Sequence, residues 1–150
     1  MIDIYNTTFE VSLRILIIMN TTKRKLTIER ITALDFIATY GKDFGVSEHN
    51  LHGDNKFRFS EYASKRRIIA QSIKELVLKG YIKANYNKNG FNYSISSSGA
   101  SFCNSFNDDY AKEYKRIVEE ANNLFYNYSD RKLVNCINQH GVSIFGGKKQ

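Results

Sequence analysis

The chain has 150 residues, of which 42% are hydrophobic and 25% charged, so it has the composition of one globular domain and is too short for a tandem of large domains. Its 22 Lys and Arg against 15 Asp and Glu give a net charge of +7, which favours a polyanion or an acidic protein surface as the partner. Residues 1–100 contain 15 basic and 9 acidic side chains, a net charge of +6. Residues 101–150 contain 7 basic and 6 acidic side chains, a net charge of +1. We therefore expect the basic surface in the first two thirds.

Two features exclude further classes of protein. Cys103 and Cys136 lack the spacing of a zinc site or a disulfide framework, and we interpret both as apolar fillers. The apolar stretch at residues 11–19 contains Arg14 and is far shorter than the roughly 20 residues of a membrane span, and no basic segment precedes it. We expect a cytoplasmic protein without a membrane contact.

Residues 8–19 are mostly apolar and predict a helix that is buried on more than one side. Thr27 is a suitable N-cap for a second helix that reaches about Tyr40, with a carboxylate, Glu29, in its first turn. A third helix is predicted from Ser60 as its cap to a glycine stop at Gly80. One side of it carries an apolar stripe and the opposite side a wholly polar one, formed by Ser60, Ser64, Arg67, Gln71 and Lys74.

A long loop at residues 41–59 separates the second and third predicted helices, and loops of this length inside a compact domain are often functional. It carries two histidines, followed by Asp54 and Asn55. His49 and His52 form a His-x-x-His pair, but no further ligand follows at a suitable spacing, so we expect hydrogen bonds that structure the loop rather than a metal site. An enzyme that uses the two histidines is a remaining alternative.

The dipeptide Asn89-Gly90 predicts a β-hairpin with a type I′ turn. A two-residue loop at this position pairs Lys88 with Phe91, Tyr86 with Tyr93 and Ala84 with Ile95, and it places the apolar residues of both strands on one face.

After the hairpin, a heptad-like seam predicts an amphipathic helix that needs a partner surface. The seam consists of Tyr110, Tyr114, Ile117, Ala121, Leu124 and Tyr128. A short last helix is predicted from residues 129–130. We interpret residues 98–145 as a helical extension for assembly.

The order of these elements predicts a mainly α fold with a small β-hairpin, namely a winged helix-turn-helix with extra C-terminal helices. Residues 1–150 are expected to form a single domain, with residues 8–97 as the winged-helix core. The run from Ile73 to Gly99 resembles the MarR- and PadR-like winged helices in its Leu-Val-Leu-Lys-Gly-Tyr-Ile and Tyr-Ser-Ile segments. The separation of nearly twenty residues between the second and third helices departs from a plain helix-turn-helix.

If the partner is DNA, the third helix enters the major groove, and its first turns supply the base contacts. Lysines and arginines on both sides of it meet phosphates, and the hairpin tip touches the backbone or the minor groove. The alternatives are a solvated basic face or a dock for an acidic protein. The residues of this predicted face are Lys56, Arg58, Ser64, Lys65, Arg66, Arg67, Gln71, Lys74, Lys83 and Lys88. The sequence contains no catalytic motif, so we expect neither enzymatic activity nor a cofactor.

Three stretches together resemble one family: residues 4–15 (IYNTTFEVSLRI), residues 34–45 (LDFIATYGKDFG) and residues 50–55 (NLHGDN) leading into residues 59–67 (FSEYASKRR). They are similar to the small middle component of bacterial ABC three-component, Lamassu-like antiviral defence systems. The resemblance implies a non-catalytic adaptor between an SMC/Rad50-like ABC ATPase and an effector, often a nuclease, with double-stranded DNA as a further partner. The competing hypothesis is a homodimeric MarR/PadR-like transcription regulator that uses the first helix and the helix of residues 110–128 as its dimer interface.

Overall fold

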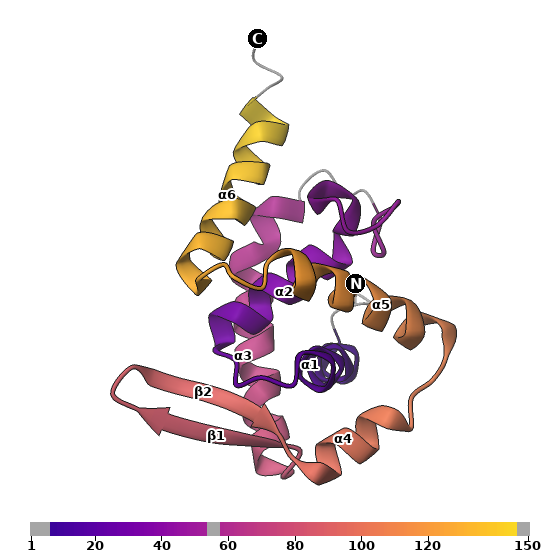
Figure 1. The fold of residues 1–150 in the computed structure, drawn as a ribbon, viewed down its shortest axis with the longest axis vertical. Coiled ribbons are helices and arrows are strands. Elements are labelled where there is room, and N and C mark those ends of the chain that lie inside the picture. The colour runs from indigo at the N-terminus through magenta and orange to yellow at the C-terminus, as the bar shows by residue number, and fades with distance from the viewer. Residues whose placement is uncertain (1–6, 54–57, 147–150) are drawn as a thin grey trace.

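The computed structural model describes residues 7–53 and 58–146, which form a mainly helical fold with one small antiparallel hairpin (Figure 1). A short 3₁₀ helix, Gly41–Phe44, follows the second helix, and another, Arg58–Glu61, leads into the third. The main elements are α1 (Thr8–Thr22), α2 (Ile28–Thr39), α3 (Tyr62–Leu78), β1 (Ile82–Asn87), β2 (Gly90–Ile95), α4 (Ser97–Asn104), α5 (Asp109–Leu124) and α6 (Asp130–Gly146). In the described part of the chain no helix is both long and apolar enough to cross a bilayer.

Helices α1 and α2 form the centre of the core. Along α1, Val11 and every residue from Leu13 to Met19 are buried, which confirms the prediction of a helix buried on more than one side. This helix packs against α2, α3, α4 and α5. Helix α2 is buried from Arg30 to Thr39, and the Thr27 hydroxyl accepts a hydrogen bond from the Arg30 N–H at 3.0 Å, as expected of its N-cap.

Helix α3 begins one residue later than predicted. Its N-cap is Glu61, which makes no capping hydrogen bond with its side chain, because residues 58–61 already form a 3₁₀ turn. The assignment of Ser60 as the cap was therefore wrong. The apolar stripe, Ile69, Ile73 and Leu76, is buried as expected.

The hairpin is present, but its register differs from the prediction. Asn87 pairs with Gly90, Tyr86 with Phe91 and Ile82 with Ile95, so the two-residue loop consists of residues 88 and 89. Gly90 has a φ of 108°, whereas the positive φ values that a type I′ turn needs are not found at residues 88 and 89. The shift moves the pairing by two residues, so the predicted set of apolar residues still shares one face.

The base of the hairpin is tied to the helices on two sides. The Leu26 N–H donates to the Tyr93 carbonyl at 2.9 Å and the Tyr93 N–H to the Leu26 carbonyl at 2.8 Å, so the α1–α2 connection forms a bridge to β2. On the other strand, β1 packs against α3. Figure 1 shows the two strands extending away from the helices towards their turn.

The C-terminal helices differ from the prediction in number and length. Helix α4 separates the hairpin from α5, and α6 is 17 residues long rather than short. Asp108 caps α5 by accepting a hydrogen bond from the Ala111 N–H at 2.8 Å, as expected of an acidic residue at a helix start.

The seam of α5 is covered by this chain itself. Tyr114, Ile117 and Ala121 have no exposed surface, because α5 packs against α1 and α2. The prediction that these three residues form an assembly surface was therefore wrong. The hypothesis that α1 and α5 form a dimer interface was also wrong, because the apolar faces of both helices are buried in the core of this chain. Tyr110 is half-buried, and Leu124 at the end of the helix is 55% exposed.

Gly99 allows α4 to pack against the connection between α3 and β1. A Cβ atom at this position would collide with the backbone carbonyl oxygen of Tyr81, and that carbonyl also accepts a hydrogen bond from the Ser96 N–H at 3.0 Å. The obstacle is backbone that is held in place by a hydrogen bond, so a larger residue forces the start of α4 away from Tyr81.

We predict that Gly99→Ala lowers the free energy of unfolding by about 2–3 kcal/mol, as overpacking does in a close contact. Urea denaturation followed by circular dichroism measures this. The control is Ser97→Ala, at an exposed position of the same helix turn, which should change stability by less than about 0.5 kcal/mol. Equal stabilities of the two variants would contradict the prediction.

Candidate partner-binding face

The outer side of α3 presents a polar surface. Ser64, Arg67, Gln71 and Lys74 are all exposed, because the opposite side of the helix is buried against α1 and α2. In the part of the chain that the structure describes, Arg67 and Lys74 form no ion pair. We call these four residues the α3 face. Their charges and hydrogen-bonding groups are available to an anionic partner.

Lys65 was predicted to belong to this face, and the structure contradicts that prediction. Its side chain is only 5% exposed and points into the core, where its Nζ lies 3.1 Å from Asp35 Oδ2. The reason is its position on the helix: Lys65 is on the same side as Ile69 and Leu76. Lys65 therefore cannot reach a base edge or a phosphate.

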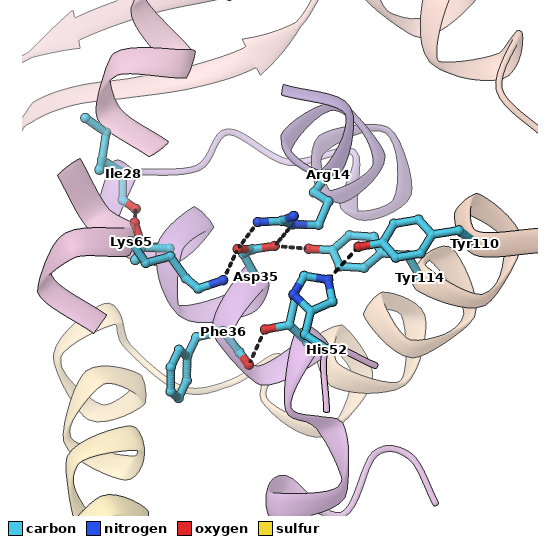
Figure 2. Close-up of polar contacts among 10 residues, drawn as sticks. Arg14, Ile28, Asp35, Phe36, His52, Lys65, Tyr110 and Tyr114 are labelled. Atoms are coloured by element: carbon cyan, nitrogen blue, oxygen red, sulfur yellow. Dashed lines mark hydrogen bonds and ion pairs between the residues drawn. The ribbon is translucent and has the colours of Figure 1, made fainter. Parts of the chain in front are cut away.

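Asp35 is the centre of a buried cluster that joins four helices (Figure 2). Its Oδ1 accepts hydrogen bonds from Arg14 Nε at 2.8 Å and from the Tyr114 hydroxyl at 2.5 Å. Its Oδ2 accepts from Arg14 Nη2 at 3.3 Å and from Lys65. Arg14 comes from α1, Asp35 from α2, Lys65 from α3 and Tyr114 from α5, and none is more than 5% exposed.

The protonation of the cluster follows from burial and from the two cations. Burial by itself raises the pKa of Asp35, but the charges of Arg14 and Lys65 and the donated hydrogen bonds outweigh it and hold that pKa well below its usual range. Burial lowers the pKa of Lys65, and Asp35 compensates for only part of this effect. For Tyr114, burial beside the Asp35 carboxylate raises the pKa, so its hydroxyl stays protonated and donates. The cluster is a charged, solvent-excluded support for the four helices.

Arg66 lies at the surface, but it forms an ion pair with Glu29. Its guanidinium donates to both carboxylate oxygens of Glu29, at 2.8 and 2.5 Å, and the two side chains are 46% and 43% exposed. The hydrogen bond from Arg66 lowers the pKa of Glu29. Arg66 is thus a weaker candidate for phosphate binding than Arg67 or Lys74.

Of the four remaining predicted residues of the face, the structure describes the side chains of two. Lys83 on β1 and Lys88 in the hairpin turn are both exposed. Lys56 lies outside the described residues, and so does the side chain of Arg58.

The long loop is held against α5 by one of its predicted residues. His52 Nε2 lies 2.7 Å from the Tyr110 hydroxyl, and its backbone N–H donates to the Thr39 carbonyl at 3.4 Å. Asn50 is buried and accepts a hydrogen bond from the Lys42 N–H at 3.0 Å. His49 is exposed beside a shallow groove that α5 lines with Glu113.

Asp54 and Asn55, the other two predicted loop residues, lie outside the described part of the chain. Within the described residues, no three His, Cys, Asp or Glu side chains lie close enough together to bind a metal ion.

Arg30 forms a second buried anchor. It is 4% exposed and donates to the carbonyls of Tyr128 at 2.5 Å and Phe125 at 3.1 Å, which belong to the turn after α5. It also lies 3.5 Å from Asp130 Oδ1, at the start of α6. Carbonyl groups at the end of a helix favour a cation, so Arg30 fixes both C-terminal helices to α2.

Sequence reasoning did not identify Arg14, Asp35 and Tyr114 as one cluster. The available signal was a charged residue inside an otherwise apolar helix, since Arg14 interrupts residues 11–19 and Asp35 lies among Ile31, Leu34 and Ala38. Buried charges need partners, but periodicity does not identify which distant residues supply them. The cluster draws one member from each of the first two stretches that carry the family resemblance, and Lys65 from the third.

Comparison with known proteins gives one family. Residues 4–145 match the family described as ABC-three component (ABC-3C) system Middle Component 2. No curated protein and no solved structure matches the chain.

We predict that Asp35→Asn lowers the free energy of unfolding by about 3–5 kcal/mol at pH 7, because Arg14 and Lys65 lose their buried countercharge. Lys65→Met removes a cation whose charged form is disfavoured by burial and should cost less than about 2 kcal/mol. Chemical denaturation measures both, with Glu119→Gln on the exposed side of α5 as the control. Similar losses for all three variants would contradict a central role for Asp35.

The pH dependence has a defined sign. Because the pKa of Asp35 is lower in the folded than in the unfolded protein, where it is about 3.9, its stabilisation is complete above that pH. It is lost as the pH falls through the folded-state value. The free energy of unfolding should therefore fall more steeply with acid below about pH 4 in the wild type than in Lys65→Met, whose Asp35 is held by one cation fewer.

Proposed function

The chain belongs to the ABC-three component system Middle Component 2 family, and on this basis we propose that it is a non-catalytic adaptor in a multi-subunit complex. It holds an SMC/Rad50-like ABC ATPase and an effector component, such as a nuclease, in one assembly of a Lamassu-like antiviral defence system. The observation that carries the proposal is the family match over residues 4–145.

Residues 8–97 are proposed to be a winged helix, with α3 as the recognition helix and the hairpin as the wing. The order of α1, α2, α3, β1 and β2 supports this interpretation, and so does the bridge between Leu26 and Tyr93. A winged helix serves both DNA and protein partners, so the fold alone does not choose between them. The exposed side chains decide what each surface can bind.

The α3 face is proposed to contact double-stranded DNA. Arg67 and Lys74 are exposed cations for phosphates, and Ser64 and Gln71 are exposed hydrogen-bonding groups for base edges. Lys83 adds an exposed cation on β1, the strand that packs against α3, and Arg66 contributes less because Glu29 pairs with it. An acidic protein surface at the α3 face is the alternative partner.

The first test of the adaptor is assembly. We expect the tagged chain, when co-expressed with the ABC ATPase and the third component encoded beside it, to co-purify with both and to elute with them in size-exclusion chromatography. A chain that elutes alone as a dimer and binds one palindrome with nanomolar affinity would instead support the transcription regulator.

The second test concerns DNA. Arg67→Glu combined with Lys74→Glu should weaken binding to duplex DNA and lower the slope of log K against log salt by about 2, because two phosphate contacts are lost. The matched control is Lys112→Glu with Lys115→Glu, the same change in charge at exposed positions of α5. Mobility shifts at several salt concentrations measure both. Equal weakening in the two variants would indicate attraction by net charge alone.

A further inference from the structure

The apolar face of the hairpin continues beyond the core into solvent. At the base, Ile82 is 2% exposed and pairs with Ile95. At the far end, Tyr86 pairs with Phe91, and these side chains are 74% and 57% exposed. Both pairs lie on the same face, because alternate residues of a strand point to the same side.

The two aromatic rings form a preformed apolar knob. Their centroids are 4.8 Å apart with an interplanar angle of 60°, and the Tyr93 ring stacks on Phe91 at 6.5 Å. The bridge to Leu26 fixes β2 at Tyr93, so the knob has a defined position relative to the helices. Figure 1 shows this end of the hairpin away from the helical body. Exposed aromatic rings on a rigid support are typical of protein interfaces.

The hairpin carries charges of one sign. Lys88 is exposed in the turn beside the knob, and Lys83 is exposed on β1, on the strand face opposite to that of Tyr86. No Asp or Glu occurs between Glu75 and Asp108 in the sequence. A complementary surface therefore combines an apolar socket with an acidic rim.

We propose that the knob of Tyr86 and Phe91 is the site where this chain docks on another protein component of its system, into an apolar socket rimmed by Asp and Glu side chains. This rests on the proposed adaptor function and gives it a location. Duplex DNA offers phosphates and polar base edges, which the lysines match and the two aromatic rings do not. The α3 face and the knob thus divide the two partners between a polar and an apolar surface.

The experiment compares the two exposed rings of the knob with an exposed ring elsewhere on the protein. Phe91→Ser combined with Tyr86→Ser should weaken binding to the co-purifying component by about 30-fold or more, as the loss of two interface anchors does. Phe9→Ser is the matched control, because Phe9 is 56% exposed and packs edge-on against one ring, that of Phe106. It should leave the Kd within about 3-fold. Biolayer interferometry with the purified component measures the Kd, and circular dichroism checks that each variant is folded.

A charge variant tests the acidic rim separately. Lys88→Glu keeps both rings and should weaken the same complex by about 10-fold at low salt, with a smaller effect at high salt. Duplex and single-stranded DNA are measured with the same variants.

The outcomes separate the two proposals. If the wild type binds neither component, the adaptor function and the knob both fail. If it binds and the Tyr86/Phe91 variant binds equally well, or if Phe9→Ser is equally damaging, the knob alone is overturned. Loss of DNA binding with retained protein binding would identify the hairpin as a nucleic-acid wing and would also overturn it.

Discussion

The structure depends on one carboxylate. Asp35 accepts hydrogen bonds from Arg14, Lys65 and Tyr114, and these groups come from three other helices. Burying an ion is costly unless its hydrogen bonds are satisfied, so the helices must meet in an arrangement that brings all three donors to the same carboxylate. Hydrophobic packing among α1, α2, α3 and α5 supplies most of the stabilisation, whereas the cluster selects the rotation of each helix about its axis.

The cluster lies on the same side of α3 as the buried apolar stripe, so both direct the opposite side of that helix to solvent. With Lys65 directed to Asp35, the positions on the opposite side of the helix, among them Arg67 and Lys74, must face outwards. Part of the positive charge is therefore used inside the protein, since Arg14, Arg30 and Lys65 are all buried among the described residues. The net charge of +7 consequently overstates the exposed cations, and the proposed DNA contact depends on a smaller set of side chains than the composition implies.

The C-terminal helices have a different role from the one that their pattern indicated. The amphipathic seam of α5 covers α1 and α2, and Arg30 holds the turn between α5 and α6. These helices complete the core, whereas the rings of Tyr86 and Phe91 at the far end of the hairpin stay exposed in the described part of the chain. An adaptor needs such a surface on a rigid body, because flexible docking elements lose conformational entropy on binding.

The sequence alone determined the local features. The apolar character of α1, the Thr27 cap, the existence of the hairpin and the polar stripe of α3 each depend on neighbouring residues, and all are present in the structure. Only the tertiary structure decided the direction of Lys65, the partner of the α5 seam and the association of Arg14 and Tyr114 with Asp35. Periodicity identifies the residues that share a face, but what covers that face depends on elements far away in the chain. The hairpin register was missed because both registers keep the same side chains on the same face, and the backbone geometry at Gly90 distinguishes them.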